Sequence, residues 1–155
     1  MARPRIEGLD PSDLELRNAT YQVFVELGRA PSIEELAAAR GQPVDVVRDG
    51  WRRLHEAHAL VVDHETSELL MANPFAARAT DFRVYAEERT WFANCAWDAF
   101  GIGAALGVDS VIETVCPDCS DPIQISVTAG VPDDLASVFH VLVPAAQWWN
   151  DITHT

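Results

Sequence analysis

The chain has 155 residues, enough for one ordinary domain or for a small domain joined to a modest second one. Its hydrophobic fraction of 48% is typical of a folded protein and excludes a disordered chain. Eleven basic residues, all of them arginine, face 24 acidic ones, which gives a net charge of −13. A field of this sign disfavours non-specific attraction to nucleic-acid phosphates or anionic lipid. The longest apolar run is too short to span a bilayer, and no secretory segment opens the chain, so we expect a cytoplasmic protein without membrane contact.

The first part of the chain predicts three helices followed by a β-hairpin. Ser32 and Glu35 form a capping box for the second helix, and Gly28 and Gly41 are typical stops for the first and second. The expected elements are helices over 9–27, 31–41 and 43–60, and strands over 59–63 and 68–72. This is the order of a winged helix-turn-helix, so we expect a winged-helix-like N-terminal domain over residues 1–80.

A winged helix can bind DNA through its third helix, or it can serve as a packing or interaction module. Here that helix holds Arg48, Arg52 and Arg53, but acidic residues alternate with them. Residues 1–80 contain nine arginines against thirteen acidic residues, a balance of −4. Proteins that read DNA usually carry a basic footprint. The sequence therefore favours the interaction module over DNA binding.

The second part of the chain, residues 81–155, predicts a small α+β core with an antiparallel sheet. The expected elements are strands over 81–86, 110–116, 121–129 and 137–144, a mainly buried helix over 89–106, and a short helix or turn over 145–152. This part holds eleven acidic residues and only two arginines, so it carries −9 of the total charge.

A thiol and a carboxylate interrupt the apolar helix expected over 89–106. Residues three and four apart share a helix face, which puts Cys95 and Asp98 on one apolar stripe with Trp91, Ile102 and Leu106. Desolvation should raise the pKa of Asp98 and let it carry a proton, and amides of a nearby helix start should lower the pKa of Cys95. The alternative is structural, because free cysteine usually packs as a small hydrophobe.

Cys116 and Cys119 lie in a Cys-Pro-Asp-Cys turn between two expected strands. A thioredoxin-like site is a poor interpretation, because its Cys-x-x-Cys opens a helix and a strand follows here. A strand–turn–strand of this kind also has the shape of a zinc knuckle, but a structural zinc site needs four ligands. The remaining donors are Cys95, His140 and His154, so half of a zinc site and a plain turn stay equally open.

Three stretches in order resemble the organomercurial (alkylmercury) lyase family. "NCAWD" matches the family's Cys-x-x-Asp helix, "SVIETVCPDCSDPIQISV" resembles its strand–Cys–turn–strand, and "HVLVP" follows. The resemblance covers most of the chain, from a winged-helix-like beginning to an unusual mixed core. Cys116 falls where the family often has a further, largely structural cysteine.

The resemblance implies protonolysis of a carbon–mercury bond, which gives a hydrocarbon and Hg(II) without an added cofactor. Cys95 would bind the mercury, and Asp98 would move a proton between the thiol and the leaving carbon. The residue types agree with this role, since soft thiolates suit soft metals. The resemblance also implies a small organomercurial or soft metal ion as the ligand and a mercuric reductase as a partner.

The family's second metal-binding thiol lies further along its sequence, but no cysteine follows Cys119 here. The sequence therefore indicates a divergent or C-terminally truncated member. Cys116 or Cys119 could replace the second thiol only if their turn folds over the helix of Cys95. The alternative function is that of a soft-metal-binding (Hg, Zn or Cu) winged-helix regulator or a non-catalytic metal-binding protein.

Overall fold

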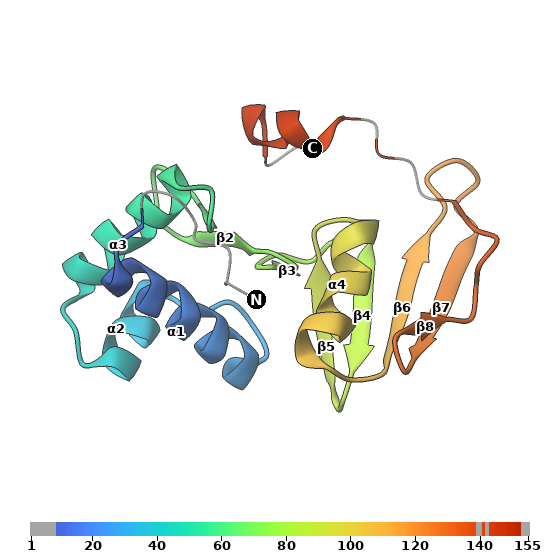
Figure 1. The fold of residues 1–155 in the computed structure, drawn as a ribbon, viewed down its shortest axis with the longest axis horizontal. Helices are drawn as coiled ribbons and strands as arrows, with labels where there is room; N and C mark the ends of the chain where they lie inside the picture. Colours follow the sequence, from blue (N-terminus) through green and yellow to red (C-terminus); the bar gives the residue numbers. More distant parts are fainter. Residues whose placement is uncertain (1–8, 139–140, 142, 153–155) are drawn as a thin grey trace.

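The computed structural model describes residues 9–138, 141 and 143–152, and within them helices come first and an antiparallel sheet follows (Figure 1). The helices are α1 (Pro11–Leu27), α2 (Ile33–Arg40), α3 (Val44–Glu56) and α4 (Ala96–Leu106), with a 3-10 helix η1 (Ala145–Asn150). The strands are β1 (Val61–Val62), β2 (Leu69–Ala72), β3 (Phe75–Ala76), β4 (Phe82–Ala86), β5 (Arg89–Ala93), β6 (Ser110–Val115), β7 (Pro122–Thr128) and β8 (Val131–Pro132). The predicted α+β class is confirmed.

The helix ends follow the local signals in the sequence. The Asp10 carboxylate accepts a hydrogen bond from the Asp13 amide (2.9 Å) at the start of α1. The predicted Ser32–Glu35 capping box is present at the start of α2. Gly28 ends α1 in the left-handed conformation, with its amide bonded back to the carbonyls of the last turn. The first three helices and the hairpin β1–β2 therefore occur in the predicted order.

The strands of the described residues form one sheet in the order β1-β2-β3-β5-β4-β6-β7-β8, with every neighbouring pair antiparallel. The hairpin that follows α3 is thus continuous with the sheet of the second part. The predicted division at residue 80 and the winged-helix description stay predictions. The predicted strand over 137–144 is absent where it is described, because residues 137, 138, 141, 143 and 144 have no strand structure, and residues 139, 140 and 142 lie outside the described residues.

The helical part and the sheet share one hydrophobic core. Phe24 of α1, Phe75 of β3 and Trp91 of β5 pack together, with ring centroids 5.1 to 6.3 Å apart. The guanidinium of Arg89 donates hydrogen bonds to the carbonyls of Val25 and Glu26 at the end of α1. A cation there satisfies carbonyls that the helix leaves unpaired and complements its dipole. These contacts fix α1 against the strands that lead into α4.

The arginines of α3 are all engaged within the chain. Arg48 pairs with Asp45 and Arg52 with Asp49 on the same helix. Arg53 binds both carboxylate oxygens of Asp13 on α1, at distances of 2.7 to 3.1 Å, and Asp13 is buried. A guanidinium held by a carboxylate is a weaker attractor of phosphate, so these pairs favour the packing role of the helix over DNA binding.

The predicted helix over 89–106 is wrong in its first half. Residues 89–93 form β5, which pairs with β4, and α4 begins only at Ala96. The sequence "RTWFA" is rich in β-branched and aromatic residues, which favour a strand, and an apolar run this short fits either helix or strand. Trp91 therefore lies on the sheet, and the predicted stripe from Trp91 to Leu106 does not exist as one helix face.

The chain returns to the helical part at η1, where a short helix or turn was predicted (Figure 1). The indole of Trp149 stacks on the imidazole of His58, with centroids 4.0 Å apart, and meets His55 edge-on. β3 and β8, each of two residues, were not predicted. Among the described residues no helix has both the length and the apolar character needed to cross a membrane.

Candidate active site

Cys95 and Asp98 lie where the chain passes from β5 into α4. Cys95 has extended backbone angles and is the N-cap residue of α4, and Asp98 lies in the first turn. α4 packs on β4 and β5 (Figure 1). Gly101 allows a close approach, because a Cβ there would lie 3.1 Å from Cβ of Pro74, beside β3. The sheet and this proline therefore fix α4 in place.

The Cys95 thiol is half-buried, and this burial raises its pKa above the ordinary value. Hydrogen bonding from the backbone amides of Asp98 and Trp97 acts in the opposite direction, while the charge of Asp98 adds to the rise in pKa. The sequence-based expectation of a lowered pKa is wrong. The amides of the helix start are present, as expected, but desolvation of the sulfur outweighs them.

The Asp98 carboxyl is also half-buried, and this burial raises its pKa, as predicted from the sequence. The side-chain amide of Asn94 opposes the rise in pKa by donating a hydrogen bond to Oδ2 of Asp98 over 2.9 Å. Asp98 is therefore a carboxyl that gains a proton more readily than an exposed aspartate does.

A hydrogen-bonded chain ties Asp98 to the helical part. Asn94 also donates to Oδ1 of Asn73 (3.2 Å), and the Tyr21 hydroxyl donates to the carbonyl of Asn73 (2.8 Å). Burial raises the pKa of Tyr21, and the nearby Asp98 charge adds to that rise. Sequence reasoning missed Asn73 and Tyr21, because nothing in a single sequence links positions so far apart. Asn94 could have been found, since it immediately precedes Cys95.

Cys116 and Cys119 lie apart from Cys95, in the exposed turn between β6 and β7. The turn is closed by hydrogen bonds from the amide of Cys116 to the carbonyl of Asp121 (2.8 Å) and from the amide of Ser120 to the carbonyl of Cys116 (2.9 Å). Within the described residues no group of three or more His, Cys, Asp or Glu side chains is placed to hold a metal ion. The structure therefore gives no support to a zinc knuckle, and it does not join this turn with Cys95 and Asp98 in one site. His140 and His154 lie outside the described residues.

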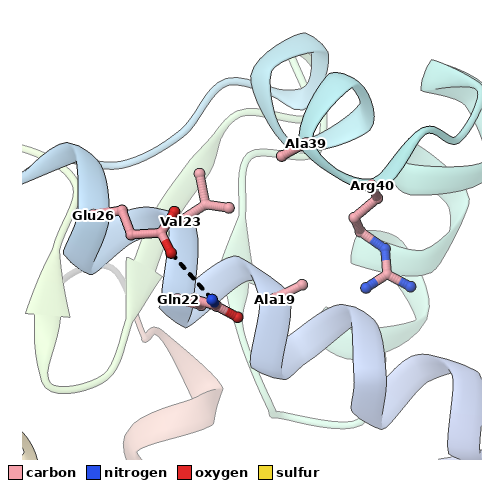
Figure 2. A pocket seen from close by; sticks show the side chains of 6 residues that line it. All are labelled: Ala19, Gln22, Val23, Glu26, Ala39 and Arg40. Atoms are coloured by element: carbon pink, nitrogen blue, oxygen red, sulfur yellow. Dashed lines mark hydrogen bonds between the residues drawn. The ribbon is translucent and has the colours of Figure 1, made fainter.

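Two shallow hollows lie along α1. Figure 2 shows the first, of about 380 Å³, where Arg40 and Ala39 face a side of α1 on which Gln22 donates to Glu26. The second, of about 440 Å³, lies between α1 and α4 and is lined in part by Tyr21 and Leu106. Neither hollow has Cys95 or Asp98 among its lining residues. The chemistry of the thiol and the carboxyl thus belongs to the start of α4 and to neither hollow.

Comparison with known proteins gives a match to one family model and a similarity in fold to a solved structure. The family model of the alkylmercury lyases, MerB, matches residues 75–155. A solved structure described as the mercury-bound form of MerB2 is similar with a TM-score of 0.65 and 21% sequence identity. That match covers 83% of this chain and 62% of the other, so the chain spans less than two thirds of that protein's length. A search of curated proteins finds no match.

Proposed function

The chain belongs to the alkylmercury lyase family, and from this premise we propose that it cleaves the carbon–mercury bond of an organomercurial by protonolysis. The products are a hydrocarbon and Hg(II). The observation that carries the proposal is the pair at the start of α4: a half-buried thiol at the N-cap and, three residues later, a half-buried carboxyl whose pKa burial raises. A soft ligand and a proton carrier thus lie on one helical turn.

The raised pKa of Cys95 makes the thiol itself the source of the proton. When the sulfur binds the mercury of the substrate, its proton leaves and passes to the carboxylate of Asp98. Asp98 then gives this proton to the carbon, the electron pair of the carbon–mercury bond becomes the new C–H bond, and Hg(II) stays on Cys95. The sum is one thiol and one organomercurial converted to one hydrocarbon and one mercury thiolate, and mercury stays in the +2 state.

Burial serves this sequence of steps in two ways. It keeps the thiol protonated until mercury displaces the proton, and it makes the carboxylate a better acceptor of that proton. Asn94 holds the carboxyl from the side through the hydrogen bond to Oδ2, and Asn73 holds Asn94 in turn. We assign positioning roles to Asn94 and Asn73. Because Cys95 is half exposed, a thiol from solution can supply a second sulfur to the metal.

The wider setting follows from the same proposal. A lyase that liberates Hg(II) needs a protein that consumes it, so we propose a mercuric reductase as the functional partner and the cytoplasm as the location. We keep the winged-helix-like interpretation of residues 1–80 as part of this proposal, in the role of a packing module. A DNA-reading regulator is not favoured, because the arginines of α3 are engaged by Asp45, Asp49 and Asp13.

The test is a single-turnover assay with methylmercury and excess free cysteine, in which methane is measured in the headspace. We expect the unsubstituted chain to release methane and Cys95→Ser to release none. Asp98→Asn should slow the release by about 10²- to 10⁴-fold, the usual contribution of a positioned acid or base. Asp118→Asn is the matched control for Asp98→Asn, since it neutralises an exposed carboxyl outside the pair. No methane from the unsubstituted folded chain would contradict the proposal.

A further inference from the structure

A series of hydrogen bonds runs from α1 to the Asp98 carboxyl through the turn between β2 and β3. Asn73 and Pro74 form this turn. On one side, the Tyr21 hydroxyl of α1 donates to the Asn73 carbonyl over 2.8 Å. On the other side, Pro74 lies against α4, where a Cβ at Gly101 would be 3.1 Å from the Cβ of Pro74. The turn therefore connects α1 with the helix that carries Asp98.

The side-chain amide of Asn94 is the central member of this series. Its nitrogen donates to Oδ1 of Asn73 over 3.2 Å and to Oδ2 of Asp98 over 2.9 Å. An amide nitrogen has two hydrogens, so both are used. The opposite orientation of the amide would turn its oxygen toward two acceptors. Asn73 therefore fixes the orientation of the Asn94 amide, and this amide in turn holds one oxygen of the carboxyl.

The Tyr21 side chain is itself held within α1. Arg17, one turn earlier, lies with its guanidinium carbon 4.6 Å from the centroid of the Tyr21 ring and donates to the hydroxyl over 3.4 Å. A cation over the face of an aromatic ring is attracted by the quadrupole of the ring. Burial raises the pKa of Tyr21, so the hydroxyl keeps the hydrogen that it gives to Asn73. Tyr21 is therefore a fixed donor, supplied by a helix far in sequence from Cys95 and Asp98.

The Tyr21 side chain has two parts with separate surroundings. Its ring lines the hollow between α1 and α4, so a packing role belongs to the ring. The hydrogen bond to Asn73 belongs to the hydroxyl. Tyr21→Phe keeps the ring and removes only the hydroxyl. This substitution therefore separates an effect on the hydrogen bonds from an effect on packing.

We propose that Tyr21 is a positioning residue of the lyase reaction: acting through Asn94, it holds the Asp98 carboxyl in the place that proton transfer needs. The reaction rests on the proposed lyase function, whereas the link from Tyr21 to Asn94 does not. Proton transfer requires donor and acceptor within hydrogen-bond reach, and a small misplacement of a reacting group slows a reaction strongly. Without the Tyr21 hydroxyl, the turn at Asn73 loses its hydrogen bond to α1, and Asn94 then holds the carboxyl less firmly.

The first test is a double-mutant cycle on methane release from methylmercury in a single turnover, with excess free cysteine and slightly below neutral pH. Tyr21→Phe should slow the release by about two- to tenfold, the contribution of one hydrogen bond. Because Tyr21 acts through Asn94, adding Tyr21→Phe to Asn94→Leu should cause no further loss. The matched control is Tyr85→Phe, which removes a hydroxyl bonded to Glu113 over 2.9 Å and should leave the rate unchanged. An unchanged rate in Tyr21→Phe, or losses that multiply in the double variant, would overturn the proposal.

The second test measures the link itself and needs no turnover. In nuclear magnetic resonance of the isotope-labelled chain, the side-chain amide of Asn94 is identified by its absence from Asn94→Leu. Tyr21→Phe should shift this resonance and speed the exchange of its hydrogens with water, whereas Tyr85→Phe should change neither. An Asn94 amide that does not respond to Tyr21→Phe would overturn the proposal.

Circular dichroism of each variant establishes that the fold is intact. If the unsubstituted chain releases no methane yet the Asn94 amide responds to Tyr21→Phe, the lyase function fails and the link between α1 and Asn94 stands. The two proposals therefore fail on different measurements.

Discussion

The three cysteines occupy two environments that treat a thiol in opposite ways. Cys95 caps a helix that packs on the sheet, and burial raises its pKa although two backbone amides face the sulfur. Cys116 lies in an exposed turn, where two similar amides act without a desolvation penalty of that size and lower its pKa. Hydrogen bonding from amides is common to both places, so the difference in pKa comes mainly from burial of Cys95. The charge of Asp98 adds to the rise at Cys95, and the Cys119 side chain adds to the lowering at Cys116.

This difference separates two kinds of thiol chemistry. A buried thiol that keeps its proton can supply that proton to a reaction, provided that an acceptor such as Asp98 lies beside it. A thiol whose pKa is lowered loses its proton more readily, and the thiolate is the form that binds a metal ion. In the proposed lyase reaction, the first kind of thiol takes part in breaking the carbon–mercury bond.

The largest expected effect is on alkylation of the native chain by iodoacetamide at neutral pH. Cys116 should react several-fold faster than Cys95, because the thiolate is the reacting form and Cys95 is both more protonated and more buried. Peptide mass spectrometry after short reaction times gives the rate at each cysteine. In urea the rates should converge, since the environments are lost. Equal alkylation rates at Cys116 and Cys95 in the native chain would contradict the difference in thiol pKa and burial between the two regions.

Some features of the fold and of the candidate site could be predicted from the sequence, and others could not, for physical reasons. Helix ends were predictable because caps such as Ser32–Glu35 and Gly28 act within a few residues. The direction of the pKa shift of Asp98 was also predictable, because a carboxyl in an apolar run loses solvation wherever the run folds. The start of α4 was misplaced, since "RTWFA" fits a strand and a helix equally well by periodicity.

The direction of the pKa shift at Cys95 and the hydrogen-bond partners around Asp98 depend on tertiary structure. Amides lower the pKa of a thiol and burial raises it, and only the packed fold determines which is larger. Tyr21 and Asn73 reach the site through pairing of distant segments, which leaves no local pattern in one sequence.

A smaller effect is expected from the hydrogen bond that supports the buried pair. Asn94→Leu removes the donor to Asp98, so the pKa of that carboxyl should rise further above its usual value. In the free enzyme the carboxylate must be unprotonated to accept the thiol proton, so the acidic limb of kcat/KM should move to higher pH. We expect a several-fold loss of kcat/KM below neutral pH and little change above it, measured as methane release across a pH series.

The control for this variant is an amide–carboxylate pair elsewhere on the sheet. Gln124 of β7 donates to Glu113 of β6 over 3.2 Å, in a hydrogen bond that is exposed to solvent. Gln124→Leu should leave the pH profile of methane release in place, because it removes a hydrogen bond of the same kind that involves neither Cys95 nor Asp98. A uniform loss of activity in Asn94→Leu at every pH would instead indicate a structural role for Asn94.

The smallest expected effect is on stability, and it follows from the same burial. The pKa of Asp98 is raised in the folded chain, so the folded state binds more protons there than the unfolded state does. The free energy of unfolding therefore falls as the pH rises from the ordinary value of 3.8 through the raised pKa. Asp98→Asn carries no charge and should be more stable at pH 7, by at most about 1 kcal/mol, because the partly exposed carboxyl is screened by solvent. Urea unfolding followed by circular dichroism measures the difference, which should shrink toward zero in acid.

Asp118→Asn, at an exposed position of the β6–β7 turn, should change stability by less than about 0.5 kcal/mol at either pH. A less stable Asp98→Asn at pH 7 would mean that the charged carboxylate stabilises the start of α4. Burial would then not be what dominates at Asp98, and the raised pKa on which the proposed proton transfer depends would be contradicted.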